Sequence, residues 1–210
     1  MKMQNTKPKT GVILQMPAAK QPMKDKIADE VLSHWESLRN GRLVPKRSDV
    51  DPRALKKALN YTFILEQHTN GDLKFRLAGS KVCDCMGMEV RGMPAHAIID
   101  VQDRDRFQSA LHRLQKVSEI IDMQLTQGAR LILLPLSDEN NDVSRVLGCL
   151  IANPDRPVFP TRMGILSINA QRVVNAPSVK ALELAETQTP FRPRIKKAAR
   201  SGPPVLKLVK

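Results

Sequence analysis

Three runs rich in β-forming residues follow one another in the second half of the chain. The runs EIIDMQL, ARLILLPL and VSRVLGCLIAN are separated only by TQG and SDENND. Short polar or glycine-containing separators are typical of turns, so this pattern predicts a meander of three antiparallel strands. A sheet of this kind forms one wall of a core, and the rest of the chain must supply the other wall.

A hairpin is predicted earlier in the chain. The runs YTFILEQ and LKFRLAG flank HTNGD, in which Asn70-Gly71 is a dipeptide that accepts the positive backbone angles of a tight turn. Strict alternation in the second run places Phe75 and Leu77 toward the core and Arg76 outward. We therefore expect a surface acid as the partner of Arg76.

Helices are predicted on both sides of this hairpin. The segment KIADEVLSHWESLRN, residues 26–40, has apolar residues at helical spacing and is followed by Gly41, which stops a helix. DPRALKKALN predicts a short helix with Asp51 as its N-cap, and short helical pieces are expected over residues 80–100. DRDRFQSALHRLQKV predicts a longer amphipathic helix, whose apolar side is formed by Phe107, Ala110, Leu111, Leu114 and Val117.

Two strands, a helical insert and three further strands together predict an α+β fold. The expected architecture is a five-stranded antiparallel sheet with helices on one face, preceded by an N-terminal helix.

Three motifs lie along this order of elements. They read W..LR.GR..P.R.D.DP..L before the first strand, F.FRLAG...C...G.E..G in the middle and LLPL.......R.LG near the end. Their positions are occupied by Trp35, Leu38, Arg39, Gly41, Arg42, Pro45, Arg47, Asp49, Asp51, Pro52, Leu55, Phe75, Arg76, Leu77, Ala78, Gly79, Gly87, Glu89, Gly92, Leu133, Leu134, Pro135, Leu136, Arg145, Leu147 and Gly148. Over residues 31–155 the motifs and the element order resemble a PAS-like family common in alphaproteobacteria. The resemblance implies a PAS fold and a sensory or regulatory module.

The net charge of +13 is concentrated at the two ends of the chain. Residues 1–26 carry six lysines and one acid, residues 190–210 carry seven basic residues and no acid, and the remaining 163 residues hold 21 basic and 20 acidic ones. Ends rich in Pro, Lys and Arg cannot bury enough apolar surface to order themselves, so they predict basic tails and not a basic folded surface.

These observations divide the chain into five segments. They are a disordered basic tail over 1–25, an N-terminal helical segment over 26–59, a PAS-like domain over 60–155, a C-terminal extension over 156–189 and a second disordered basic tail over 190–210. In the extension, SINAQRVV could add one strand to the sheet and VKALELAE could form a short helix.

The favoured function is a stand-alone signalling adaptor of the PAS type. It acts through protein partners and forms a homodimer, with or without a small molecule in the PAS pocket. The residues predicted to form the partner interface are Ile27, Val31, Trp35 and Leu38. Those predicted to line the pocket are Val82, Met86, His96, Ile98 and Leu111. The alternative function is binding of the basic tails to nucleic acid or to an anionic membrane surface, with the domain as a scaffold.

Cys83 and Cys85 raise the question of a metal or redox site. One C-x-C pair on a helix diverges too far to chelate well, so packing against the sheet is favoured over a soft-metal site or a thiol redox switch. His96 is the candidate axial ligand if haem binds. A flavin photosensor needs a cysteine within an Asn- and Gln-rich helical motif, which Cys83 does not supply. The sequence therefore predicts no metal and leaves the cofactor open.

Enzymatic activity is not predicted. The chain contains no G-x-S-x-G elbow, P-loop, dinucleotide fingerprint or H-E-x-x-H sequence. No apolar run is long enough to span a membrane. Three cysteines, an odd number, do not suggest a disulfide framework, and the N-terminus does not read as a secretory signal, so we expect a cytoplasmic protein.

Overall fold

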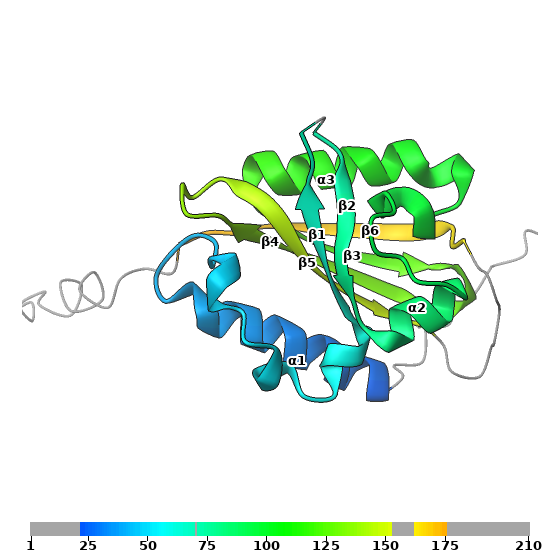
Figure 1. Cartoon of the computed structure of the whole chain (residues 1–210), viewed down its shortest axis with the longest axis horizontal. Helices are drawn as coiled ribbons and strands as arrows, with labels where there is room; N and C mark the ends of the chain where they lie inside the picture. Colours follow the sequence, from blue (N-terminus) through cyan, green and yellow to red (C-terminus); the bar gives the residue numbers. More distant parts are fainter. Residues whose placement is uncertain (1–21, 70, 153–161, 176–210) are drawn as a thin grey trace, which may run out of the picture. The chain divides into compact units, whose positions relative to one another are not determined.

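The computed structural model of the chain describes residues 22–69, 71–152 and 162–175. These residues contain one antiparallel sheet of six strands in the order β2-β1-β5-β4-β3-β6 (Figure 1). The strands are β1 (Thr62–Gln67), β2 (Leu73–Ala78), β3 (Glu119–Leu125), β4 (Arg130–Ser137), β5 (Val143–Ile151) and β6 (Ile165–Arg172). The five predicted strands are all present, and the segment that could extend the sheet does so as β6, which pairs with β3.

Three α-helices and several single turns of 3-10 helix surround this sheet. The α-helices are α1 (Pro22–Arg39), α2 (Ser80–Met86) and α3 (Arg104–Val117). The 3-10 helices are η1 (Arg47–Asp49), η2 (Pro52–Leu55), η3 (Ala58–Tyr61), η4 (Ala95–Ile98), η5 (Val101–Asp103) and η6 (Thr126–Gly128). No helix among the described residues is both long enough and apolar enough to cross a bilayer.

The short helix predicted over DPRALKKALN forms as the two separate turns η2 and η3. Asp51 caps the first turn as expected, because its Oδ1 accepts a hydrogen bond from the backbone N–H of Arg53 at 2.9 Å. Lys56 then has a φ of 39°, which ends the turn before a longer helix can develop.

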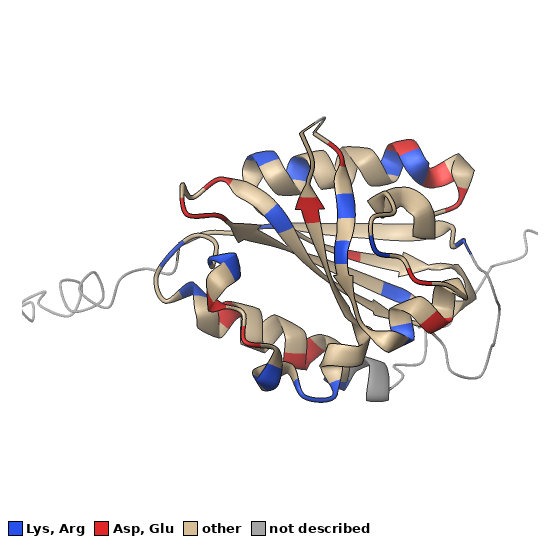
Figure 2. Cartoon of the chain, in the orientation of Figure 1, with Lys and Arg blue, Asp and Glu red and all other residues tan. Residues whose placement is uncertain are grey.

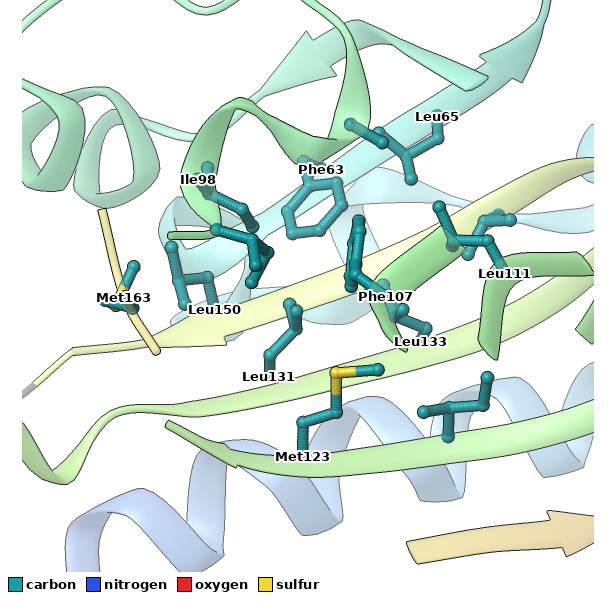
Figure 3. Packing of buried hydrophobic residues seen from close by; sticks show 14 of the residues in the cluster. Phe63, Leu65, Ile98, Phe107, Leu111, Met123, Leu131, Leu133, Leu150 and Met163 are labelled. Atoms are coloured by element: carbon teal, nitrogen blue, oxygen red, sulfur yellow. The ribbon is translucent and has the colours of Figure 1, made fainter. Parts of the chain in front are cut away.

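One face of the sheet, here called the inner face, is covered by α2, η4 and α3. Phe63 of β1 and Phe75 of β2 lie on this face with their ring centroids 5.0 Å apart, and α3 adds Phe107 and Leu111. These side chains are almost completely buried in one cluster. Figure 3 shows residues of α3 and of several strands converging on it.

The opposite face, here called the outer face, is covered in part by α1. Figure 1 shows α1 and α3 on opposite sides of the sheet. Val31 and Trp35 of α1 are fully buried against Leu134 and Leu147 of the strands. The indole N–H of Trp35 donates a hydrogen bond to the carbonyl of Pro135 in β4 at 2.8 Å. The predicted fold class is therefore confirmed: α2, η4 and α3 cover one face, and the N-terminal helix α1 packs on the other.

This packing corrects the prediction for the partner interface. Ile27, Val31 and Trp35 are buried against the chain's own sheet, and Leu38 is half-buried in the same cluster. The apolar stripe of α1 is thus used inside the molecule, because the outer face of the strands offers it Ile, Leu and Cys side chains. Dimer formation itself stays a prediction.

The remaining sequence predictions fall partly outside the described residues. β1 and β2 form the predicted antiparallel hairpin, and Gly71 has the expected positive φ of 88°, while Asn70 lies outside. The tail over 190–210, most of the tail over 1–25 and the helix proposed for VKALELAE also lie outside.

Candidate functional site: a cleft on the outer face

A β-bulge in the hairpin determines which side chains reach the outer face. Ile64 pairs with Leu77 and Leu65 pairs with Phe75, so Arg76 is an extra residue in β2 without a partner in β1. The bulge breaks the alternation of β2, and Leu77 turns to the outer face, where it is 49% exposed. The prediction that Leu77 points into the core is therefore wrong. The prediction that Arg76 points outward to an acid is confirmed by Glu66, 3.5 Å away.

An open cleft lies where α1 stops covering the outer face. Its polar end has a volume of about 510 Å³. In Figure 2, basic segments of β2 and β5 flank the acidic end of β1 in this region. The polar end is lined by Arg47, Ser48, Ile64, Glu66, Arg76, Leu77, Arg91, Ser137, Asp138, Glu139 and Arg145.

Glu66 is one of the three acids that line the polar end. Its Oε1 accepts hydrogen bonds from Arg145 Nε at 3.0 Å and from Arg145 Nη2 at 2.6 Å, and its Oε2 lies 3.5 Å from Arg76 Nε. Arg145 is held from β5 because it pairs with Glu66 in the register of β1 and β5. One carboxylate is thus shared between two guanidinium groups.

The other two acids of the lining lie in the turn between β4 and β5, and each has a partner. Asp138 Oδ1 accepts hydrogen bonds from the backbone N–H groups of Asn140 at 2.9 Å and Asp142 at 3.1 Å. Desolvation would raise the pKa of Asp138, but these bonds, with Ser144 and the charge of Arg145, lower that pKa below its ordinary value. Glu139 forms an ion pair with Lys46 at 2.7 Å.

Two arginines of the lining have no such partner. Among the residues that the structure describes, the side chains of Arg47 and Arg91 form no hydrogen bond or ion pair. Arg47 begins η1, in a loop that Asp49 holds by pairing with Arg42 and by accepting the backbone N–H of Lys46 at 3.3 Å. The loop is therefore fixed by its neighbours while the guanidinium of Arg47 stays available.

The cleft continues into an apolar end of about 350 Å³. Arg47, Ile64 and Leu77 line both ends, which makes the two ends neighbours. The apolar end is otherwise lined by Val50, Pro52, Leu55, Leu59, Asn60, Thr62, Phe63, Ala78, Gly79 and Leu147. We call the two ends together the outer-face cleft.

Gly79 allows the wall of the apolar end to form. A Cβ at Gly79 would lie 2.4 Å from the carbonyl oxygen of Asn60. The glycine thus lets the end of β2 pass against η3, and its own N–H donates to the carbonyl of Thr62 at 2.8 Å.

The residues predicted to line a PAS pocket lie on the other side of the sheet. Val82, Met86, Ile98 and Leu111 are buried in the inner-face cluster, and Leu111 also borders a separate surface cleft beside α3. His96 does not join that cluster, since its Nδ1 lies 3.1 Å from Nε2 of Gln108 at the surface. The structure therefore brings four of the five residues together as core and places His96 outside.

The three cysteines occupy different environments. Cys83 and Cys85 of α2 are partly buried against the inner-face cluster, and burial raises the pKa of the Cys85 thiol. Cys149 of β5 is fully buried on the outer face, where desolvation raises the pKa of its thiol to about 12. No group of three or more His, Cys, Asp or Glu side chains in the described ranges is arranged to hold a metal ion.

The motif residues separate into two groups once the structure is known. Most of them hold the fold: Trp35 bonds Pro135, Arg42 pairs with Asp49, and Gly148 leaves room for the ring of Phe63. Arg47, Arg76 and Arg145 instead meet in the cleft, although they are far apart in the sequence. In the sequence these three arginines belong to three separate motifs, and no sequence signal indicated that they meet.

Comparison with known proteins agrees with this architecture. The antiparallel sheet with helices on its inner face is an α+β fold. A family model described as a PAS domain matches residues 23–151, more than half of the chain, and the chain therefore belongs to the PAS-domain family. A search of curated proteins gives no match.

Two solved structures are similar to part of the chain. The crystal structure of the PAS domain of a protein from Colwellia psychrerythraea is 15% identical, with a TM-score of 0.36, and covers 50% of this chain and 96% of that one. A structure described as "Flavin Analogue Sheds Light on Light-Oxygen-Voltage Domain Mechanism" is 17% identical, with a TM-score of 0.35, and covers 49% of this chain and 84% of that one.

Proposed function

We propose that this PAS-domain protein is a regulatory adaptor that passes a signal through contacts with protein partners, as a homodimer or in a hetero-complex. Membership of the PAS-domain family carries the proposal, because that class of domain is sensory. On the basis of the three motifs, the proposal also assigns the chain to the alphaproteobacterial branch of the family. It assigns no catalytic reaction to the chain. It also places the protein in the cytoplasm, where the three free thiols would stay reduced.

The packing of the inner face supports an adaptor that works by protein contact. The side chains expected around an enclosed ligand, such as Val82 and Ile98, are fully buried among other apolar residues. An enclosed ligand would have to displace close-packed side chains, which costs free energy. The outer face, by contrast, keeps an open cleft and exposed apolar residues such as Leu59 and Leu77.

Native mass spectrometry of the protein purified gently from its host tests this proposal, with an absorbance spectrum of the same sample. We expect a defined dimer or a complex with a second protein, and no coloured cofactor. A monomer at every concentration, insensitive to candidate partners, would contradict the adaptor. A stoichiometric chromophore would instead make the protein a sensor with an enclosed cofactor.

A second candidate function rests on the charge of the tails. The excess of basic residues over 1–26 and 190–210 favours weak binding to nucleic acid or to an anionic membrane surface. Binding of this kind releases counterions, so its affinity should fall steeply as salt is raised. An affinity that does not change with salt concentration would exclude this second function.

A further inference from the structure

We propose that the outer-face cleft binds a small amphipathic carboxylate, with the carboxylate in the polar end and an apolar tail in the apolar end. The site is distinct from the inner-face core and does not depend on the adaptor function proposed above. It would give the domain a chemical input on the face that α1 leaves open.

The charges of the polar end suit an anionic head group. Its lining contains four arginines and three acids, and Lys46 outside the lining pairs with one of these acids, Glu139, which leaves two positive charges in excess. Each acid already has partners, as described for Glu66, Asp138 and Glu139, whereas Arg47 and Arg91 have none within the described part of the chain. A guanidinium presents parallel N–H donors that match a carboxylate, so Arg47 is the residue expected to hold the head group.

The apolar end suits a short hydrocarbon tail. Val50, Leu55 and Leu147 line it, and they are buried. The apolar end lies next to Arg47, and this determines how the ligand is oriented. The head group and the tail must join where the two ends of the cleft share Arg47, Ile64 and Leu77. Leu77 reaches this junction only because the bulge at Arg76 turns it outward.

The size of the cleft fits a small molecule. Ligand sites in proteins commonly span roughly 300–1,000 Å³ and combine an apolar lining with a few placed polar groups. The two ends, of about 510 and 350 Å³, fall within that range individually. Of the two unpaired arginines, Arg47 lines both ends and Arg91 lines the polar end but not the apolar end. A head group at the junction therefore meets one guanidinium, which favours a singly charged carboxylate over a doubly charged phosphate ester.

Octanoate is the probe, titrated calorimetrically into the full-length protein at low salt. Three comparison ligands separate its features: 1-octanol lacks the charge, acetate lacks the tail, and octyl phosphate carries more charge. We expect octanoate to bind at least about tenfold more tightly than 1-octanol or acetate, since a hydrogen bond to a charged group is commonly worth that factor. Octyl phosphate should bind more weakly than octanoate.

Two pairs of variants locate the binding. Arg47→Gln should weaken octanoate about tenfold, whereas Arg53→Gln removes the same charge from an exposed arginine outside the cleft and should leave binding unchanged. Leu77→Asn should weaken octanoate about fivefold through lost apolar contact. Its matched control is Leu166→Asn, because Leu166 is also an exposed leucine on an edge strand.

Several outcomes would overturn the proposal. Absence of octanoate binding would do so, as would equal affinity for octanoate and 1-octanol, or equal losses in Arg47→Gln and Arg53→Gln. Tighter binding of octyl phosphate than of octanoate would replace the carboxylate by a phosphate head group. None of these results bears on whether the protein forms a dimer or a hetero-complex, so a failure of the adaptor proposal would be seen separately.

Discussion

The two faces of the sheet are covered in different ways, although the same strands supply both. In β1, Phe63 and Leu65 point to the inner face and are enclosed by helices, while Ile64 and Glu66 point to the outer face. On the outer face α1 covers the centre of the sheet and leaves the β1–β2 end open. Alternating residues of one strand can therefore build a closed core on one side and an accessible cleft on the other.

The contrast between the two faces predicts that the covered part of the outer face contributes as much to stability as the inner face. Phe107→Ala, which empties the inner core, and Trp35→Ala, which removes the main contact of α1, should each lower the free energy of unfolding by about 3–5 kcal/mol. Trp35→Ala also leaves the carbonyl of Pro135 without its donor.

Urea unfolding of both variants measures this effect, with Leu77→Ala as a control from the open end of the outer face. Because Leu77 is half-exposed, its truncation should cost much less than either core variant. A small loss in Trp35→Ala alone would mean that α1 is only loosely attached, and the apolar stripe of α1 would again be a candidate partner surface.

The inner face should be sensitive to added volume as well as to lost volume. A Cβ at Gly148 would lie 2.0 Å from the ring of Phe63, so Gly148→Ala forces the ring to move and should cost about 1–3 kcal/mol. The double variant Phe63→Leu, Gly148→Ala tests the cause. If the ring is the obstacle, the two changes should cost less together than the sum of their separate costs. Additive costs would place the strain elsewhere.

Much of the fold could be predicted because its elements carry local signals. The meander, the hairpin and the helix now called α3 follow from periodicity and turn residues, which act within a few positions of one another. The attachment of α1 could not be predicted in the same way. An amphipathic helix fits a partner or the outer face of its own sheet equally well, and only the tertiary structure decides between them.

The cleft could be predicted least. Arg76 and Leu77 lie in a regular alternating run, and no local sequence signal indicates the bulge that turns Leu77 outward. The arginines of the polar end come from η1, β2, β5 and the loop after α2, so their convergence is a property of strand order. The one available signal was that Arg47, Arg76 and Arg145 belong to motifs without having an obvious local role.

A weaker, pH-dependent effect is expected where β6 joins the inner side. The backbone N–H of Ile165 donates to Asp103 Oδ2 at 2.8 Å, and Arg106 Nη1 lies 2.7 Å from Oδ1. The bond from Ile165 is the main cause, and that from Arg106 the second, of a lowered pKa at Asp103. A carboxyl group with a lowered pKa in the folded state stabilises the protein at pH values above the pKa of the unfolded state, which is about 3.9 for aspartate. That contribution is lost as the pH falls through the folded pKa.

Asp103→Asn tests this contribution by urea unfolding at several pH values. The variant should be less stable than the wild type at pH 7, by less than either core variant. The difference should shrink as the pH drops below about 4, because the wild-type carboxyl then becomes neutral. A difference that stays constant down to the acid limit would show that charge at Asp103 is not what secures β6.

The smallest effect on stability should separate an arginine that holds the fold from one that faces the open cleft. Arg42 donates to the carbonyls of Leu38 at 3.0 Å and Arg39 at 3.2 Å and pairs with Asp49, so Arg42→Gln should lower the free energy of unfolding by about 1 kcal/mol. Arg47→Gln, five residues later in the same loop, should change it by less than about 0.5 kcal/mol. Thermal and urea unfolding of Arg42→Gln and Arg47→Gln measure the two losses of stability. Equal losses would give Arg47 a structural role, and the open end of the outer face would then lose its main candidate for binding an anion.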